Sequence, residues 1–339
     1  MLFTLDVGSG TQDFLLYSDE NIRNCLKVIL PSPTRIVGEK IRRSNADVYL
    51  YGYTMGGGAV TAAVREHLAK GYRVFATERA ARTFADDVEK VKKMGVIVGR
   101  PRGRVVAIET RDVDLRLFSK ILGSVGYEMP ELFGIAVQDH GFSPHESNRV
   151  FRFRAFERRI SKDSRLASLV FRSREIPEEF NRMRDAAACV TDEIDAEVYV
   201  VDTAFAAIAG CAAFARLPAL LVNFGNSHIT AAVVDEDMRI AALLEHHTSV
   251  MLKRGTKAIR EMLESFKKGK LNFEDVFRDG GHGCFVRETL DVVDEVCTGP
   301  NAWVSDIRQT GGDPMIVGNL GIILLLSELG VVEMPKVIF

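Results

Sequence analysis

The chain has 339 residues, of which 47% are hydrophobic and 27% are charged, and its formal net charge at pH 7 is -2. This composition is typical of a globular protein of about two domains, and the small net charge removes any global argument for a nucleic-acid or anionic-membrane partner. The first residues enter an apolar strand without the features of a signal peptide, so we expect the chain to stay in the cytoplasm. The most apolar segment, residues 321–326, is far shorter than the roughly 20 residues that span a bilayer.

Five cysteines are scattered through the chain without the short spacings that hold a metal ion or an iron–sulfur cluster. They are Cys25, Cys189, Cys211, Cys284 and Cys297. We therefore expect isolated, buried thiols rather than a redox or metal centre.

The N-terminal part is predicted to open with three closely spaced strands and then to alternate strands with helices. The three strands cover residues 2–6, 13–17 and 25–30, and their short connections imply an antiparallel meander at one edge of a sheet. The elements predicted after them are a basic helix over 34–45, a strand over 47–51, a helix from the Gly-rich turn 56–58 to 71, a strand over 73–77, a helix ending at 93, a strand over 105–109, a helix ending at 122 and a strand over 134–138. This alternation indicates an α/β protein with a partly parallel, helix-covered sheet.

Residues 137–148 are polar and contain Gly and Pro, which is typical of a loop, and we place a domain boundary there. The segment that follows, residues 149–184, is rich in arginine. A solvated helical face explains such a charge run most simply, and a site for an anion or nucleic acid is the alternative. The aromatic spacing of a base-stacking surface is missing, which disfavours nucleic acid.

The last part of the chain restarts the same alternation. Its predicted elements are a strand over 198–201, an Ala-rich helix over 203–214, strands over 219–224, 230–235 and 240–245, a basic amphipathic helix over 249–266, a helix ending at 296, a short strand near 303, a turn over 310–314 and an apolar helix over 318–329. The expected division is an N-terminal lobe over 1–148, an Arg-rich helical connector over 149–190 and a C-terminal lobe over 191–339.

The segment Leu5–Tyr17, LDVGSGTQDFLLY, joins two apolar strands through a G-S-G-T turn at residues 8–11. The glycines let backbone N–H groups approach an anion closely, and Asp6 at the strand end can hold a hydrated Mg²⁺. A tight hairpin is the alternative, because Gly-Ser-Gly is ordinary turn chemistry. The segment Leu220–Glu245 repeats the architecture of strand, polar Gly turn, strand, turn and strand. Two such units can grip the phosphates of a nucleotide from both sides, which favours the phosphate hypothesis.

With these motifs, the sequence resembles the superfamily of actin, the heat-shock chaperone ATPases and the sugar kinases. Asp6–Thr11, DVGSGT, resembles its first phosphate motif, D-x-G-x-x-T, and Asp202–Gly210, DTAFAAIAG, resembles its first connecting helix. Leu221–Thr230 resembles the second phosphate motif, and Gly311–Pro314 resembles the Gly-Gly turn of the adenosine motif. The resemblance implies the α/β actin-like ATPase fold, in which two ribonuclease-H-like lobes have a nucleotide cleft between them.

Over nearly its whole length, the chain also resembles a largely archaeal family of unknown function that carries the legacy label of a pyruvate formate-lyase activating enzyme. A radical S-adenosylmethionine activase needs thiolates close enough to hold an iron–sulfur cluster, and the cysteines of this chain lack that spacing. We therefore do not assign that activity.

The superfamily resemblance implies roles for individual residues. Asp6 would hold Mg²⁺ through water and act in catalysis with Asp202, which would order a metal-bound or attacking water. The residues implied in binding ATP are Gly8, Ser9, Gly10 and Thr11 in the first motif, Gly225, Asn226, Ser227 and His228 in the second motif, and Gly311 and Gly312 beside the nucleoside.

Two of these positions, Asp202 and His228, have a second interpretation, and Asn223 departs from the motif. Asp is a preferred helix N-cap, which is the alternative role for Asp202. Asn223 begins the second motif where many members of the superfamily have an acid, which weakens the metal site and leaves phosphoryl transfer open. His228 can donate a hydrogen bond to a γ-phosphate, or it faces solvent or a neighbouring side chain.

Other groups of residues are less specific. The run Gly56–Gly58 before a helix can expose N–H groups to an anion or allow close packing of the helix. The turn over 279–283, DGGHG, is a candidate for lining a substrate cleft. Metal-capable side chains occur in three short groups without a recognised ligand spacing, so no metal site is predicted there. These groups are Asp139, His140 and His145; Glu245, His246 and His247; and Asp279, His282 and Cys284.

We expect an ATP-binding, Mg²⁺-dependent phosphotransferase or ATPase that acts on a small molecule, with ATP and Mg²⁺ as cofactors. A non-catalytic nucleotide-binding or scaffold protein of the same fold is the alternative. A protein that binds an anion or nucleic acid through the Arg-rich segment is a more distant one. No membrane partner is expected, and the sequence leaves the oligomeric state open.

Overall fold

The computed structural model describes residues 1–337, and the chain divides into two compact units. The first unit contains residues 1–14, 28–142 and 172–200. The second unit contains residues 15–27, 143–171 and the chain from 201 onward. The segment predicted as an Arg-rich connector therefore contributes residues to both units.

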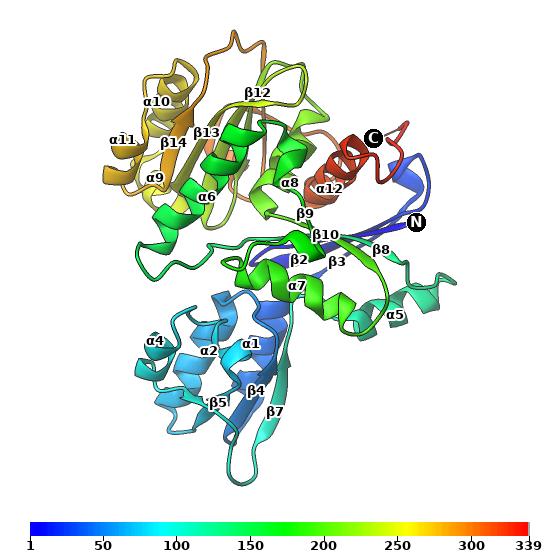
Figure 1. Cartoon of the computed structure of the whole chain (residues 1–339), viewed down its shortest axis with the longest axis vertical. Coiled ribbons are helices and arrows are strands. Elements are labelled where there is room, and N and C mark those ends of the chain that lie inside the picture. Colours follow the sequence, from blue (N-terminus) through cyan, green and yellow to red (C-terminus); the bar gives the residue numbers. More distant parts are fainter. Residues whose placement is uncertain (338–339) are drawn as a thin grey trace. The chain divides into compact units, whose positions relative to one another are not determined.

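A six-stranded sheet in the order β3-β2-β1-β8-β10-β9 contains the first motif (Figure 1). Its strands are β1 (Leu2–Val7), β2 (Thr11–Tyr17), β3 (Leu26–Pro31), β8 (Leu132–Val137), β9 (Phe171–Arg172) and β10 (Glu197–Val201). β1 and β8 are parallel, with Asp6 opposite Ala136. On one face, the ring of Phe3 lies 4.6 Å from that of Phe14 and 5.0 Å from that of Phe118 in α5 (Leu115–Ser124). These buried aromatic contacts fix the strands around the motif.

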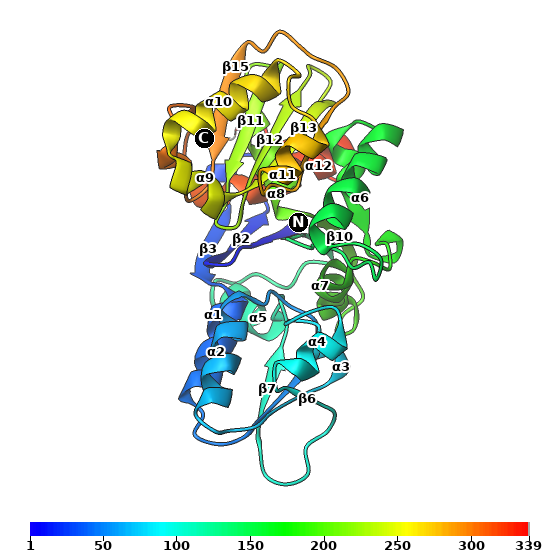
Figure 2. The ribbon, with the colours of Figure 1, turned by 90° about the vertical axis from the view of Figure 1, so that its left-hand side faces the viewer.

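A four-stranded parallel sheet in the order β6-β5-β4-β7 lies within the first unit. Its strands are β4 (Val48–Gly52), β5 (Val74–Ala76), β6 (Ile97–Val98) and β7 (Val106–Thr110), and its helices are α1 (Pro33–Arg43), α2 (Gly58–Ala69), α3 (Glu78–Ala81) and α4 (Val88–Lys93). α1 and α2 pack side by side (Figure 2), so closely that a Cβ at Gly38 would lie 2.9 Å from the carbonyl oxygen of Ala59. The predicted alternation of strands and helices is confirmed. The predicted helix ending at 93 is instead two short helices, because Asp87 caps a new one.

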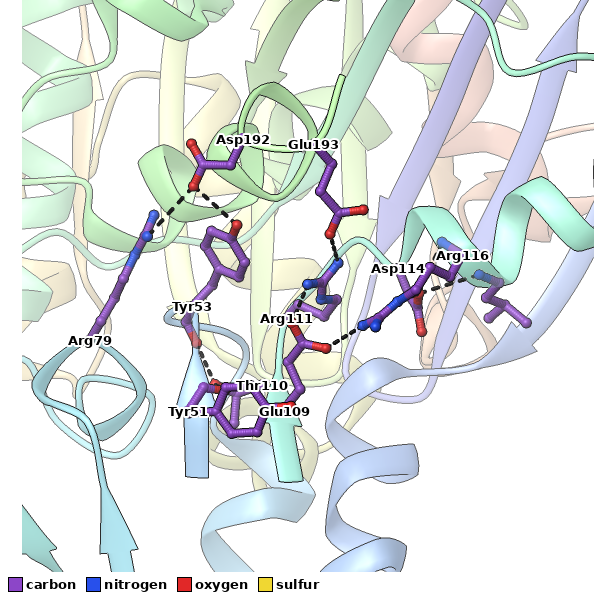
Figure 3. A network of polar contacts seen from close by, with 11 residues as sticks. Tyr51, Tyr53, Arg79, Glu109, Thr110, Arg111, Asp114, Arg116, Asp192 and Glu193 are labelled. Atoms are coloured by element: carbon purple, nitrogen blue, oxygen red, sulfur yellow. Dashed lines mark hydrogen bonds and ion pairs between the residues drawn. The ribbon is translucent and has the colours of Figure 1, made fainter. Parts of the chain in front are cut away.

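Polar contacts join the end of this sheet to Asp192 and Glu193, which directly follow α7 (Asn181–Thr191), as Figure 3 shows. The Tyr53 hydroxyl donates a hydrogen bond to Asp192 at 3.0 Å, and the Arg79 guanidinium lies 4.3 Å from the centre of the Tyr53 ring. Burial, followed by the hydrogen bond to Asp192, raises the pKa of Tyr53 to about 12, so its hydroxyl stays a donor at neutral pH. Arg111 forms ion pairs with both Glu109 and Glu193. The network anchors the four-stranded sheet within the unit.

The second unit contains a six-stranded sheet in the order β14-β13-β12-β11-β15-β16. Its strands are β11 (Ala219–Phe224), β12 (His228–Val234), β13 (Ile240–His247), β14 (Gly283–Val286), β15 (Asp294–Thr298) and β16 (Arg308–Gln309). Its helices are α6 (Asn148–Lys162), α8 (Thr203–Ala212), α9 (Thr248–Arg254), α10 (Thr256–Lys267), α11 (Phe273–Arg278) and α12 (Val317–Glu328). β11 pairs antiparallel with β12 and parallel with β15.

The two six-stranded sheets share one plan. Five strands of each sheet follow the same order, β3-β2-β1-β8-β10 in one and β13-β12-β11-β15-β16 in the other. In both, the first strand along the chain is parallel to the later strand next to it, β1 to β8 and β11 to β15. The sixth strand differs, since β9 extends the first sheet beside β10 and β14 extends the second beside β13. This repeat confirms the predicted fold class, the α/β actin-like ATPase fold with two ribonuclease-H-like lobes.

Three predicted elements of the second unit are wrong. The helix ending at 296 is replaced by β14 and β15, because pairing with β13 and β11 overrides the helix-like spacing of the apolar residues. The helix over 249–266 is two helices, α9 and α10, separated at Gly255 with φ +85°. The strand near 303 is a 3₁₀ turn over Ala302–Val304. Within residues 1–337, no helix combines the length and hydropathy that a membrane crossing requires.

Helices α8 and α12 pack closely at two glycines (Figure 1). A Cβ at Gly210 would lie 2.1 Å from the carbonyl oxygen of Val317, and one at Gly321 would lie 1.8 Å from that of Ala206. Backbone atoms cannot move aside as a flexible side chain can. The two helices therefore require glycine at both positions.

Gly321→Ala is expected to lower the free energy of unfolding by about 1–3 kcal/mol or more, because the added methyl group forces α8 and α12 apart. Urea unfolding measures the change. The matched control is Gly123→Ala in α5, where no atom lies within 4 Å of the added Cβ, and where the substitution should be neutral or stabilising by up to about 1 kcal/mol. Equal effects of the two substitutions would contradict the packing argument.

Candidate functional site

The first motif forms the turn between β1 and β2. The Gly8 N–H donates a hydrogen bond to the Thr11 carbonyl at 3.0 Å, and the Ser32 N–H donates to the Gly10 carbonyl at 3.1 Å. The second bond fixes the turn to the start of α1. Ser9 at the tip is exposed, and Asp6 at the end of β1 is partly exposed.

The second motif forms the same turn between β11 and β12. The Gly225 N–H donates to the His228 carbonyl at 3.0 Å. The Gly225 carbonyl accepts hydrogen bonds from the Thr248 hydroxyl at 2.8 Å and the Asn301 amide at 3.0 Å. A Cβ at Gly225 would lie 2.9 Å from the His228 oxygen, so the turn requires glycine there. The exposed tip of the turn is formed by Asn226 and Ser227.

The two turns are equivalent in geometry and in place. Each begins with a glycine whose N–H donates a hydrogen bond to the carbonyl three residues later. Each also follows the equivalent strand of its sheet, β1 for the first turn and β11 for the second. Asp6 and Asn223 occupy the same position, two residues before that glycine. The tight hairpin predicted as the alternative for the first motif is confirmed, and the second motif has the same geometry. Phosphate binding, which is compatible with this geometry, stays a prediction.

Asp202 lies between β10 and α8 and is fully buried. Its carboxylate accepts a hydrogen bond from the Ala204 N–H at 3.0 Å, which confirms the predicted helix N-cap. The same carboxylate accepts hydrogen bonds from the Arg152 guanidinium at 2.6 and 2.9 Å. A catalytic role for Asp202 stays a prediction, and it would require this carboxylate to leave its ion pair.

Arg152 projects from α6 into the interior, where its side chain is 1% exposed. It also donates to Glu245 at the end of β13, with Nη2 3.0 Å from Oε1. Burial opposes its charge, but the carboxylates of Asp202 and Glu245 outweigh burial and raise the pKa of Arg152. The interpretation of the Arg-rich segment as a solvated face is therefore wrong at this residue, because two buried acids need its charge.

Other arginines of α6 lie over aromatic rings of the same unit. Arg149 lies 4.2 Å from the centre of the Phe277 ring, and Arg159 lies 4.3 Å from that of Phe171. Their charges contribute to packing through cation–π contacts.

His228 is buried, and its ring lies against those of His247 and His282, with centroids 5.0 and 4.4 Å away. The interpretation that it faces a neighbour is confirmed, and a contact with a γ-phosphate stays a prediction. Glu245 lies beside this group, with Oε2 3.2 Å from Nδ1 of His282. Burial would raise the pKa of Glu245, but Arg152 and then His282 hold it well below its usual range.

The remaining sequence candidates occupy separate places. Gly311 and Gly312 lie exposed in the loop before α12, where Asp313 caps a 3₁₀ turn, and their role beside a nucleoside stays a prediction. The Gly56–Gly58 run shows the close packing that was one of its two interpretations, since a Cβ at Gly57 would lie 2.5 Å from the Thr83 carbonyl oxygen.

Two more of the metal-capable residues form internal contacts. Asp139 accepts hydrogen bonds from the backbone N–H groups of Gly141 at 2.8 Å and Met183 at 2.9 Å, and burial raises its pKa to about 6. Asp279 of the DGGHG turn pairs with Arg254 at 2.6 Å and with His246 at 3.1 Å.

A family model described as "Putative pyruvate format-lyase activating enzyme (DUF1786)" matches residues 55–304, which include Asp202 and the second motif but not the first. The chain belongs to this family. Among solved structures, it is similar to the ethanolamine utilization protein EutJ from Carboxydothermus hydrogenoformans, with 12% sequence identity, a TM-score of 0.35, and 95% of this chain and 89% of that chain covered. No curated protein matches the chain.

The thiols of this DUF1786 family member do not resemble a cluster site. All five cysteines are free and buried, as predicted. Burial raises the pKa of Cys189, Cys284 and Cys297 to about 12, which disfavours the thiolate that binds iron. Among the described residues, no cysteine joins a group of three side chains placed to hold a metal ion.

Arg152→Met is expected to lower the free energy of unfolding by about 3–5 kcal/mol, because it leaves two buried acids without their cation. Denaturant unfolding measures the loss. The control is Arg43→Ala, which removes an ion pair to Glu39 from an arginine that is 80% exposed, and should cost less than about 1 kcal/mol. A loss at Arg152 no larger than at Arg43 would refute the structural role of the buried pair.

Proposed function

We propose that the protein binds ATP together with Mg²⁺ and that each of the turns at 8–11 and 225–228 is a phosphate-binding element. The observation that carries the proposal is the repeat itself. The same four-residue turn, closed by the same 3.0 Å hydrogen bond, follows the equivalent strand of two sheets with the same plan. A repeat of rigid glycine turns with exposed tips suits contacts to phosphate oxygens through backbone N–H groups.

The side chains of the turns fit phosphate and Mg²⁺ to different degrees. Ser9, Asn226 and Ser227 are exposed and offer hydroxyl and amide donors to phosphate oxygens. Asp6 is partly exposed and offers the carboxylate oxygen that Mg²⁺ prefers, directly or through water. Asn223 offers only a neutral amide at the equivalent position. The bound metal ion would neutralise phosphate charge, and Asp6 would be its ligand from these motifs.

Nucleotide binding is better supported than phosphoryl transfer. The carboxylate of Asp202 is held by Arg152 and by the N-terminus of α8, and Asn223 cannot accept a proton from water. We therefore infer a nucleotide-binding protein in which hydrolysis is slow or absent. A phosphotransferase that acts on a small molecule is the second candidate, favoured by the partly exposed carboxylate of Asp6.

Calorimetric titration of the full-length chain with ATP and Mg²⁺ tests this function. We expect binding that raises the melting temperature, and Asp6→Ala should weaken Mg²⁺-dependent binding at least tenfold, a loss of about 1.4 kcal/mol. The control is Asp195→Ala, which removes an exposed aspartate outside both motifs and should leave the affinity unchanged. Failure to bind ATP, or equal affinities of the two variants, would overturn the proposal.

Phosphate release from ATP separates the two candidates. Binding without release supports the non-catalytic protein. Release that Asp6→Ala abolishes supports the phosphotransferase or ATPase.

A further inference from the structure

Three histidines from separate parts of the chain meet in the second unit's sheet, where β12 begins and β13 ends. His228 is the first residue of β12 and pairs directly with His247, the last residue of β13. His282 immediately precedes β14, which also pairs with β13, and its N–H donates to the Glu245 carbonyl at 2.9 Å. The register of three adjacent strands thus determines the cluster.

Alternation along β13 decides which side chains join the cluster. Glu245 and His247 project on one face of the strand, and His246 projects on the other, where it contacts Asp279 at 3.1 Å. The three cluster rings have centroids 4.4, 4.7 and 5.0 Å apart. One nitrogen from each ring lies within 4.8 Å of the others. In a tetrahedral zinc site, the ligand nitrogens lie about 3.4 Å apart. Small rotations of the rings can bring the three nitrogens to that spacing.

A buried chain of charged groups lies behind the rings. Nδ1 of His282 is 3.2 Å from Glu245, Glu245 accepts hydrogen bonds from Arg152, and Arg152 donates in turn to Asp202. A carboxylate that orients an imidazole in this way is the usual outer partner of a metal-binding histidine. With Nδ1 of His282 directed at Glu245, Nε2 is the nitrogen of that ring that would face a metal ion.

The charges of these buried groups favour a cation beside the three imidazole rings. Two acids share one guanidinium, which leaves one negative charge in the interior beside the histidines.

We propose that His228, His247 and His282 form a binding site for a divalent transition metal ion, with zinc as the best match. Three imidazole ligands without a thiolate suit zinc and its neighbours in the first transition row better than Mg²⁺ or Ca²⁺, which prefer oxygen ligands. Three protein ligands leave a fourth position for water or an exogenous oxygen ligand, as in catalytic zinc sites. The three histidines do not include Asp6, the residue proposed to hold Mg²⁺, and the test of this site does not require ATP.

Titration of the tag-free, metal-depleted full-length chain with Co²⁺ tests the site. Co²⁺ replaces zinc in sites of this kind, and bound Co²⁺ of low coordination number absorbs visible light. We expect one equivalent of Co²⁺ to produce visible bands and Zn²⁺ to abolish them. His247→Ala and His282→Ala should each lower Zn²⁺ affinity at least tenfold. Glu245→Gln should lower it by about 10- to 100-fold, because His282 loses its orienting carboxylate.

The matched control is His145→Ala, which removes an exposed histidine outside the cluster and should leave Zn²⁺ affinity unchanged. Circular dichroism establishes that each variant is folded. Because His247 is less buried than His282, its variant provides the test if His282→Ala fails to fold. The absence of stoichiometric Co²⁺ and Zn²⁺ binding, or an unchanged affinity in the folded histidine variants, would overturn the proposal.

Discussion

The arrangement of α6, α8 and β13 in the second unit depends on one buried guanidinium, that of Arg152. Arg152 comes from α6, and its two carboxylate partners come from the start of α8 and the end of β13. Burying these charges is costly, and the cost is offset only when each group is paired and hydrogen-bonded. The interaction therefore fixes the relative placement of three segments that are remote in sequence. Such a network is a constraint on geometry more than a source of stability.

The ion pairs of Arg152 position residues in two candidate sites of the unit, the start of α8 and the histidine cluster. Through Asp202, it fixes the start of the helix that resembles the connecting helix of the actin-like superfamily. Through Glu245, it orients His282, whose ring lies against His228 at the end of the second turn. A side chain that sequence alone places among solvated charges thus supports the start of α8 and the histidine cluster together.

The sequence predicts the parts of the site that depend on local chemistry. Glycine turns between apolar strands identify both turns, and an aspartate before an Ala-rich run identifies the cap of α8. Arg152 is different, because its role depends on two acids that only the tertiary fold brings near it. Its place in a charge-dense, Arg-rich segment gives no local signal of burial.

The histidine cluster shows how one wrongly predicted helix prevents a site from being found in the sequence. Predicting a helix through residue 296 removes β14, and without β14 nothing places His282 beside β13. His247 and His282 then fall into separate groups of metal-capable residues, neither with a ligand spacing, and His228 belongs to a different motif. The register of β12 with β13 provides the missing information, since it sets His228 opposite His247. A prediction of pairing, rather than of spacing, would have found the cluster.

The proposed function requires that both equivalent turns bind phosphate. A crystal structure of the full-length chain with a non-hydrolysable ATP analogue and Mg²⁺ tests it most directly. We expect phosphate oxygens within hydrogen-bond distance of backbone N–H groups in the turns at 8–11 and 225–228, and Mg²⁺ on the Asp6 carboxylate or its water. A nucleotide bound elsewhere on the chain, with neither turn in contact with phosphate, would contradict it.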